Sequence, residues 1–330
     1  MSHARSKLSA GPLDGVRVLD LTRVLAGPWA SQLLADYGAD VIKVERPGRG
    51  DDTRSWGPPW LSNRDGQPTA DSAYYLSSNR NKRSICIDLG QSAGVAIVRD
   101  LARRSDIILE NFKVGTMDRF GLGYADLSAD NPGLVYCSIT AYGQSGSRAS
   151  KPGYDAMIQA SGGLMSVTGE PDGGPQKVGV AIADIMAGMY ASTAILAALT
   201  ARHETGEGQH IDVPLYDCQV AWLANQNMNY LIGGMLPGRL GTGHPNLVPY
   251  QAFATADGHL MLAVGNDRQF VDCMNCLELA ALATDERFAT NAGRVAHRDE
   301  LVARMAAAFG ARETAHWLSV LDGAGVPAGP

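Results

Sequence analysis

One aspartate near the middle of the chain, Asp184, is the only charged residue in the apolar run Val178–Gly188. The residues from Ile185 to Thr200 are apolar and rich in alanine, which is typical of a helix, so Asp184 falls where that helix would begin. A carboxylate there can accept hydrogen bonds from the free backbone N–H groups of the first turn. Asp184 is therefore either the N-cap of the helix or a carboxylate nucleophile.

The predicted position of Asp184 also suits catalysis, because a nucleophilic carboxylate must stay ionised in a place that excludes water. Burial raises the pKa of an aspartate from about 3.9 by as much as several pH units. A helix N-terminus opposes this, since it favours the anion by up to ~2 kcal/mol. We therefore expect the Asp184 carboxylate to remain charged at neutral pH.

Basic residues cluster around the predicted strands of the N-terminal half, although the chain as a whole is acidic. Ligands of open parallel sheets bind beyond the carboxyl ends of the strands, so these side chains could surround a phosphate-bearing ligand. Each of them could equally be a solvated surface charge. The helix start after Thr22–Pro28 is a further candidate anion site. The basic residues are Arg46, Arg49, Arg54, Lys82, Arg83 and Arg119.

Two phosphate-binding motifs are missing: no GxGxxG follows the first predicted strand, and no GxxxxGK[ST] occurs in the sequence. This argues against a dinucleotide-dependent dehydrogenase and leaves coenzyme A as a plausible ligand that carries phosphates and an adenine. The single CxxC, Cys273 to Cys276, has no second pair or suitably spaced histidine. We interpret it as two thiols on a helix and expect no metal site.

The composition is that of a soluble enzyme, with 330 residues, 45% hydrophobic residues and a formal net charge of -6. The negative charge argues against nucleic acid or an anionic membrane as a partner. No uncharged apolar run reaches the ~18 residues of a membrane-spanning helix, and Met1–Gly11 lacks the apolar core of a signal peptide. We expect a cytoplasmic protein, or one in an organelle matrix.

Strand-like and helix-like segments alternate through the N-terminal half, which predicts an α/β fold with a Rossmann-like open parallel sheet. The predicted strands are Val16–Leu21, Val41–Glu45, Ser84–Leu89, Asp106–Glu110 and Leu134–Ile139, and the predicted helices include Pro28–Tyr37 and Ala93–Arg104.

The pattern changes near Thr205–Gln209, which predicts a turn. Beyond it we predict a strand at Ile211–Pro214, a hairpin over Tyr250–Val264 around Asp257 and Gly258, and helices at Asp217–Leu231, Arg268–Leu279 and Arg298–Phe309. The predicted organisation is a large CoA-binding domain at 1–205, a linker at 206–228 and a smaller α+β domain at 229–330.

Several blocks spread from Gly11 to Pro330 resemble the class III CoA-transferases of the CaiB/BaiF type. The likeness rests on Pro12–Gly15, Leu19–Thr22, Ala26–Pro28, Gly38–Glu45, Asn81–Ile85, Glu110–Phe112, Ala183–Asp184 and Thr205–Gln209. Within the family, Asp51–Pro59, Tyr136–Thr140 and Val248–Phe253 are most similar to the branch that uses succinyl-CoA and glutarate.

The resemblance implies that Asp184 attacks an acyl-CoA thioester and carries CoA as an aspartyl thioester before the acceptor carboxylate takes it. One thioester replaces another, so neither ATP nor a metal is implied, and CoA is a substrate rather than a cofactor. The acceptor is expected to be a dicarboxylate such as glutarate. The CoA-binding positions implied in the same way are Val24, Leu25, Arg46, Ile87, Asn111, Phe112 and Arg119.

The segment containing Gly241, Gly243 and His244 aligns with a mobile loop that covers the catalytic carboxylate in this family. It could also be a plain connecting loop. His244 could be an ordinary loop histidine or a contact for the acceptor carboxylate.

The family forms an interlocked homodimer in which each chain closes into a ring. Its members continue beyond the motif that resembles Gly325–Pro330 and return to the large domain. This sequence stops there, so we expect that the return segment is missing and that the 330 residues form a weaker, open dimer.

Two other functions compete with the transferase. A racemase of the same fold would carry a histidine where this chain has Tyr154, between Gly153 and Asp155, and a phenol is a poor base at neutral pH. The second alternative is an inactive CoA-binding protein. Trapping the acyl group on Asp184 would distinguish a transferase from a mere binder.

Overall fold

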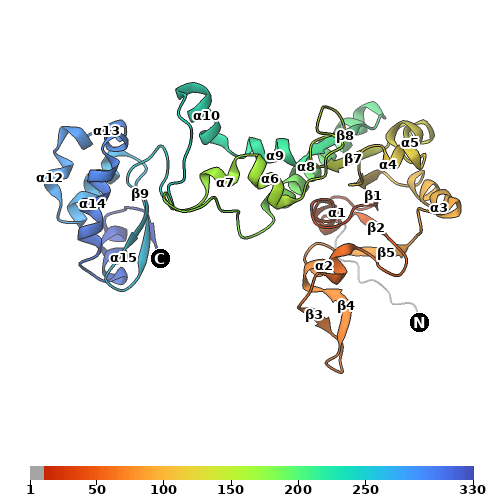
Figure 1. Cartoon of the computed structure of the whole chain (residues 1–330), viewed down its shortest axis with the longest axis horizontal. Coiled ribbons are helices and arrows are strands. Elements are labelled where there is room, and N and C mark those ends of the chain that lie inside the picture. Colours follow the sequence, from red (N-terminus) through yellow and green to blue (C-terminus); the bar gives the residue numbers. More distant parts are fainter. Residues whose placement is uncertain (1–10) are drawn as a thin grey trace. The chain divides into compact units, whose positions relative to one another are not determined.

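The computed structural model describes residues 11–330, which divide into two compact units (Figure 1). The first unit runs to Met165 and resumes at Lys177–Asn225, and the second combines Ser166–Gln176 with Gln226–Pro330. These bounds differ from the predicted ones. Most of the predicted linker, 206–228, belongs to the first unit, because it contains a strand that pairs with the central sheet. The residues in which we looked for a signal peptide lie almost entirely outside the described part of the chain.

The first unit is built on a six-stranded sheet in which every neighbouring pair is parallel. The strand order is β5-β2-β1-β6-β7-β8. The strands are β1 (Arg17–Asp20), β2 (Asp40–Glu45), β5 (Lys82–Cys86), β6 (Ile107–Glu110), β7 (Val135–Thr140) and β8 (His210–Pro214). The prediction of an α/β fold with a parallel sheet is confirmed.

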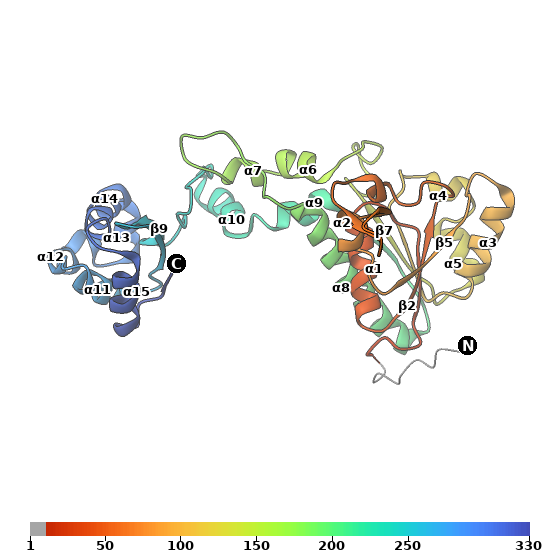
Figure 2. The same ribbon diagram turned by 90° about the horizontal axis from the view of Figure 1, so that it is seen from below.

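Helices cover both faces of this sheet (Figure 2). On one face lie α1 (Ala26–Asp36) and α8 (Ile182–Thr205), and on the other lie α3 (Ser92–Ala102), α4 (Thr116–Arg119) and α5 (Tyr124–Asp130). This two-sided covering follows from crossover connections between parallel strands.

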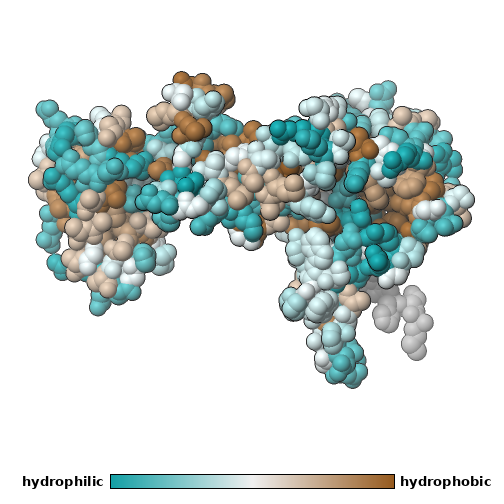
Figure 3. All heavy atoms as spheres, in the orientation of Figure 1, coloured by the Kyte–Doolittle hydropathy of each residue, from teal (hydrophilic) through white to brown (hydrophobic). Residues whose placement is uncertain are grey.

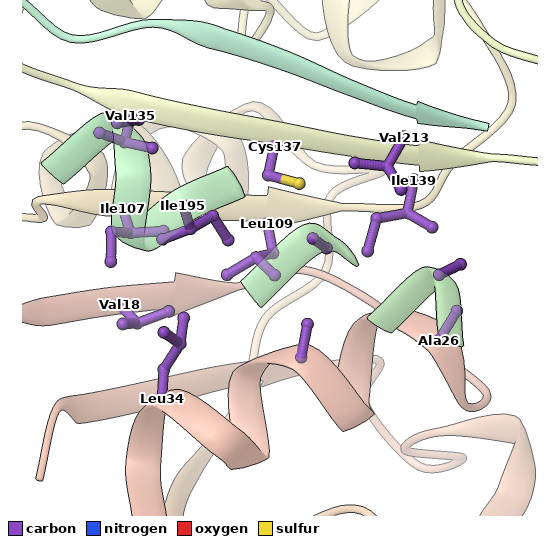
Figure 4. Close-up of a cluster of buried hydrophobic side chains, with 14 of the residues drawn as sticks. Val18, Ala26, Leu34, Ile107, Leu109, Val135, Cys137, Ile139, Ile195 and Val213 are labelled. Atoms are coloured by element: carbon purple, nitrogen blue, oxygen red, sulfur yellow. The ribbon is translucent and has the colours of Figure 1, made fainter. Parts of the chain in front are cut away.

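Alternation along the strands divides the buried side chains between two cores, because successive residues of a strand point to opposite faces. Val18 and Ile107 meet Leu34 of α1 and Ile195 of α8 in the core drawn in Figure 4. The residues that alternate with them, including Leu19, Ile108 and Tyr136, belong to the core under α3 and α5.

Helix α8 is long and apolar enough to cross a membrane by length and composition. In the first unit, however, it packs against α1, β7 and β8, and Ala187, Ala191 and Ile195 are fully buried. Gly188 permits the close approach of α1, since a Cβ there would lie 2.7 Å from the carbonyl oxygen of Ala26. We interpret α8 as a core helix.

A short segment after β2 was not predicted, because its strands are brief and mostly polar. It contains η1 (Asp52–Ser55), the hairpin of β3 (Trp60–Ser62) and β4 (Pro68–Ser72), and α2 (Ala73–Ser77). Further helices are α6 (Asp155–Ser161), α7 (Leu164–Val167), α9 (Leu215–Ala221) and α10 (Ala224–Gly233). The helix predicted at Asp217–Leu231 is thus two helices, and Ala224 at the break has a φ of 42°.

Apolar side chains of α10 and the residues after it are exposed. Leu231 is 72%, Ile232 80% and Leu236 84% accessible. The corresponding apolar surface is visible at α10 in Figure 3.

The second unit contains an antiparallel sheet, β11-β10-β9, and a set of helices around its own apolar core. The strands are β9 (Tyr250–Ala254), β10 (His259–Ala263) and β11 (Ala328–Gly329). The predicted hairpin is confirmed, since Ala254 pairs with His259 across the Asp257–Gly258 turn. The helices are α11 (Asp267–Cys276), α12 (Ala280–Ala283), η2 (Glu286–Phe288), α13 (Asn291–Ala296), α14 (Arg298–Phe309) and α15 (Thr314–Gly323).

Candidate active site

The strand order reverses direction between β1 and β6, because the chain passes from β1 to β2 on one side and later adds β6 on the other. Open α/β sheets bind ligands at such a switch point. The segments that leave the two strands are joined there by the Asn111 side chain. Its Oδ1 accepts from the Arg23 backbone N–H at 2.9 Å and its Nδ2 donates to the Arg23 carbonyl at 2.7 Å.

The residue after Arg23 is held in a strained backbone conformation. Val24 has a φ of 71°, which is rare for a β-branched residue and costs about 1–3 kcal/mol. Its backbone N–H donates to Oδ1 of Asp51 at 3.3 Å, and Asp51 in turn pairs with the buried Lys43 at 2.9 Å. The loop before α1 is therefore fixed by contacts from β2, β6 and the segment before η1.

Two cavities of about 240 Å³ each open at this switch point. Arg23 and Phe112 line both of them, and the Arg23 guanidinium lies 5.3 Å from the Phe112 ring centroid. We call the one that includes Asp184 the carboxylate cavity and the other the outer cavity. The carboxylate cavity also contains the predicted positions Val24, Leu25 and Asn111, and the outer cavity contains Arg46 and Ile87.

Asp184 is the third residue of α8 rather than its N-cap, which is Ala181. The prediction of an N-cap is therefore wrong. The capping hydrogen bonds come instead from Asp155 at the start of α6, whose Oδ1 accepts from the backbone N–H groups of Ala183 at 2.7 Å and Asp184 at 3.3 Å. Gln159 fixes Asp155, since its Nε2 donates to Oδ2 at 2.6 Å. The side chain of Asp184 is thus not needed for capping.

The Asp184 carboxylate is 8% exposed, and within residues 11–330 it accepts no hydrogen bond. Burial, with a further contribution from the charge of Asp155, raises its pKa to about 7. We expected the helix N-terminus to keep this group ionised. With a pKa of about 7, only about half of the Asp184 carboxyl groups are ionised at neutral pH, because Asp155 occupies the N–H groups that would have stabilised the anion.

Three of the basic residues considered as phosphate ligands are bound to other parts of the protein. Lys82 is buried against Asp20 at 3.2 Å, and Arg54 pairs with Glu45 at 2.7 Å and lies over the Tyr75 ring. Arg83 pairs with Asp40 on the surface at 2.6 Å. Their charges stabilise the fold and are not directed at either cavity.

The other three basic residues are exposed: Arg49 lines neither cavity, and Arg46 and Arg119 are the two phosphate contacts that the resemblance implied. Arg46 lines the outer cavity and forms an ion pair with Asp52. Arg119 is exposed on α4 and donates to Thr116 at 3.2 Å, and Thr116 lines the outer cavity.

The predicted substrate loop belongs to the second unit. Gly241 has a φ of 56°, and a Cβ there would meet the Glu170 carboxylate at 2.9 Å. His244 is a structural residue in this loop, since its Nδ1 accepts from the backbone N–H groups of Asn246 at 3.0 Å and Leu247 at 3.1 Å. Burial, with the nearby charge of Arg298, lowers its pKa.

Sequence reasoning did not assign binding roles to several residues of the carboxylate cavity. They are Arg23, Lys113, Lys151 and Tyr154. Arg23 and Lys113 directly follow the strand-end segments that the sequence pointed to, so their positions could have suggested them. Lys151 lies in a loop for which the pattern offers no comparable signal. The described residues contain no group of three potential metal ligands.

The sequence matches the CoA-transferase family III over residues 13–330. The chain belongs to this family. This CoA-transferase is 53% identical over 324 residues to the succinate–glutarate CoA-transferase of Agrobacterium fabrum, with 97% of this chain and 80% of that protein covered. It is 46% identical to the human succinyl-CoA:glutarate CoA-transferase, with 97% of this chain and 71% of the human protein covered.

The fold of this CoA-transferase is also that of a solved member. A CaiB/BaiF family protein from Brucella suis superposes with a TM-score of 0.83 at 50% sequence identity, covering 98% of this chain and 84% of that one. Acyl-CoA and carboxylate substrates follow from membership of the family.

Proposed function

We propose that this CoA-transferase moves CoA from succinyl-CoA to a dicarboxylate such as glutarate through an aspartyl-CoA thioester on Asp184. One observation carries the proposal. Asp184 lines the carboxylate cavity with its oxygens free of hydrogen bonds from the described residues, while Asp155 caps the helix from which it projects. A buried carboxylate that has no structural partner is available for covalent chemistry.

The first half of the reaction transfers CoA to the protein. An ionised Oδ of Asp184 attacks the thioester carbonyl of succinyl-CoA, the C–S bond breaks, and CoA thiolate leaves a mixed anhydride. The thiolate then attacks Cγ of Asp184, the anhydride C–O bond breaks, and succinate departs. The product is the aspartyl-CoA thioester.

The second half repeats these steps in reverse with the acceptor. A carboxylate oxygen of glutarate attacks Cγ of Asp184 and expels CoA thiolate, which forms a new anhydride. The thiolate attacks the glutaryl carbonyl, so that glutaryl-CoA leaves and the Asp184 carboxylate is restored. Each step exchanges one acyl leaving group for another, and no proton or external energy source is consumed.

The outer cavity is the proposed place for the nucleotide part of CoA. It shares Arg23 and Phe112 with the carboxylate cavity, and it is lined by the exposed Arg46, with Arg119 close by on α4. Guanidinium groups bind phosphates through charge-assisted hydrogen bonds. Asn111, Val24, Leu25 and Ile87 complete the walls.

Two considerations support this choice of substrates and reaction. The Agrobacterium, mouse and human relatives are succinate or succinyl-CoA:glutarate CoA-transferases at 46–53% identity. A racemase would need a base opposite the nucleophile position, and the side chain of Tyr154 stands in the carboxylate cavity instead of a histidine.

Hydroxylamine trapping tests the covalent step. After incubation with succinyl-CoA, hydroxylamine should convert Asp184 to a hydroxamate, which peptide mass spectrometry would place on the fragment that contains it. Asp155 in the parent protein is the internal control, because it is a neighbouring carboxylate and should stay unmodified. A hydroxamate elsewhere, or none, would contradict the assignment.

Exchange assays with succinate, glutarate, hydroxymethylglutarate, itaconate and malate then rank the acceptors.

We also propose that the protein is a homodimer. The exposed apolar residues Leu231, Ile232 and Leu236 are the observation in favour, since such clusters usually contact another protein surface. Sedimentation velocity at falling concentration tests this. Leu231→Ser with Ile232→Ser should shift the protein toward the monomer, whereas Thr200→Ser on the surface of α8 should not. A monomer at all concentrations would refute it.

A further inference from the structure

Behind the Asn111–Phe112 segment lies a buried carboxylate that the transfer reaction does not use. Glu110 ends β6 and is 4% exposed. Its Oε2 accepts from the backbone N–H of Phe112 at 2.8 Å. Glu110 therefore holds the backbone of Phe112, which lines both cavities.

A chain of polar side chains connects Glu110 to the edge of the sheet. Ser138 lies opposite Glu110 in the pairing of β6 with β7, and its hydroxyl lowers the pKa of the Glu110 carboxyl group. The Ser138 Oγ lies 2.9 Å from Nε2 of His210 on β8, the edge strand. The His210 ring stacks on Tyr124 with centroids 5.2 Å apart, so its orientation is fixed.

A small cavity of about 30 Å³ separates this chain from the segment 113–118. The titratable or charged groups that face Glu110 come from five elements. They are Tyr136 on β7, His210 and Asp212 on β8, Asp118 on α4, Tyr124 on α5, and Lys113 in the loop before α4. The surrounding carboxylates outnumber the cations, which disfavours a charge on Glu110.

We propose that Glu110, with Ser138 and His210, is a positioning residue for CoA, and that it holds the Asn111–Phe112 segment in its binding conformation when its carboxylate is ionised. The inference rests on the proposed placement of CoA beside Phe112. His210 holds the Ser138 hydroxyl beside Glu110 across the β6–β7 pair, and the Glu110 anion accepts from the Phe112 backbone N–H. Charge-assisted hydrogen bonds are about twice as strong as neutral ones, so protonation of Glu110 weakens the last contact.

The pH range of this effect is accessible to measurement. Burial, which outweighs the Ser138 hydroxyl and the hydrogen bond from Phe112, raises the pKa of Glu110 from 4.5 to about 7. Ionisation of Glu110 should lower the stability of the fold but strengthen the binding of CoA. Since the folded state holds the proton up to about pH 7 and the unfolded state loses it near 4.5, stability falls between these values as pH rises. CoA affinity should rise as Glu110 ionises around pH 7.

Isothermal titration calorimetry with CoA from pH 5.5 to 8.5 tests the inference on the whole protein. The phosphates of CoA titrate too, so the informative quantity is the ratio of the wild-type affinity to that of Glu110→Gln. The amide of this variant mimics the protonated carboxyl group without titrating. The ratio should be near one at pH 5.5 and rise about five-fold by pH 8.5. With saturating succinyl-CoA, kcat should stay within two-fold while KM changes.

Two neighbouring variants should move the midpoint in opposite directions. Ser138→Ala removes a hydroxyl that lowers the pKa of Glu110, so the transition should move to higher pH. Asp118→Asn removes a charge that raises it, so the transition should move to lower pH. Denaturant unfolding at pH 8 should find Glu110→Gln at least as stable as the parent, which excludes misfolding as the cause of weaker binding.

An affinity ratio that is independent of pH would overturn the inference. Arg46→Ala separates this outcome from failure of the proposed function. If Arg46→Ala weakens CoA binding but the ratio stays flat, only the role of Glu110 is wrong. If Arg46→Ala and Arg119→Ala both leave CoA affinity unchanged, CoA binds elsewhere, and both the placement and the inference fail.

Discussion

Two buried aspartates of the first unit differ in what surrounds them. Asp20, at the end of β1, accepts from the backbone N–H of Thr22 and from the hydroxyls of Thr22 and Ser31, and pairs with Lys82. Asp184, at the start of α8, has no partner for its carboxylate among the described residues. The same residue type is therefore a structural anchor at one place and a buried carboxylate without a partner at the other.

Their pKa values move in opposite directions for this reason. Burial raises the pKa of both, but at Asp20 the charges of Lys82 and Lys43 and the two hydroxyls more than compensate and lower it. At Asp184 nothing compensates, and the charge of Asp155 raises the pKa further, to about 7. The difference teaches that burial alone does not mark a candidate functional carboxylate, whereas burial without partners does.

The largest expected effect is the loss of activity in Asp184→Ala and Asp184→Asn. Exchange between succinyl-CoA and glutarate should fall by a factor of about a thousand or more, because without the Asp184 carboxylate the cavity lacks the group that we propose as the carrier of the thioester. CoA affinity should stay within a few-fold. Retention of a tenth of the activity would break the comparison, since Asp184 would then not be the nucleophile.

The same variants should gain stability. At about 1.4 kcal/mol per pH unit, the rise in the pKa of Asp184 from 3.8 to about 7 corresponds to roughly 4 kcal/mol of cost for the buried anion at high pH. Asp184→Asn should therefore raise the free energy of unfolding at pH 8 by one to several kcal/mol. Denaturant titration measures this, and a destabilised Asp184→Asn would contradict it.

Breaking the Asp20 anchor should act on stability instead. Asp20→Asn should lower the free energy of unfolding by about 3–5 kcal/mol, because it leaves Lys82 buried without its counter-charge. The double variant Asp20→Leu with Lys82→Met should recover much of this loss. If Asp20→Asn is as stable as the parent, the pair is not the anchor that its burial indicates.

Replacing the proposed phosphate ligands should give intermediate effects. Arg46→Ala and Arg119→Ala should each raise KM for succinyl-CoA about ten-fold, since a charge-assisted hydrogen bond contributes about 1.5–3 kcal/mol. KM for glutarate should change less. Steady-state kinetics with each substrate varied in turn checks both statements, and equal effects on the two KM values would argue against phosphate contacts.

Acidification should also reduce the rate, because the protonated Asp184 is not a nucleophile. With a pKa of about 7, the group is ionised above this value, so kcat/KM should rise with pH and level off above about 8. At pH 6 it should be about ten-fold below the plateau. A flat profile of kcat/KM between pH 6 and 8 would contradict a pKa of about 7 for Asp184 in the free protein.

The smallest effect is expected at Arg83, which was a candidate phosphate ligand by sequence. It is exposed and pairs with Asp40 on the surface. Arg83→Gln should change the free energy of unfolding by less than about 1 kcal/mol and leave both KM values unchanged. A clear increase in KM for succinyl-CoA would show that Arg83 contributes to CoA binding and that the CoA site extends beyond the outer cavity.

The parallel sheet, most of its strands and the hairpin of the second unit could be predicted, because they depend on short periodic patterns. Alternation at Val18 and Leu19 already shows a strand with two buried faces. The β3–β4 hairpin has no such pattern, since its strands are mostly exposed. The domain boundary was misplaced because the pairing of β8 with β7 joins residues about 70 positions apart, which local patterns do not show.

The sequence by itself determined the family, the placement of Asp184 at the first turn of a long apolar helix, and the strand ends around which the site is built. Only the tertiary structure decided how the charged residues are used. Local spacing makes Asp184 a helix cap and Lys82 a phosphate ligand, yet Asp155 caps the helix from 28 residues away and Asp20 captures Lys82 from 62 residues away. A charged side chain is available for chemistry only when no distant residue binds it through a hydrogen bond or an ion pair, and only folding brings such residues together.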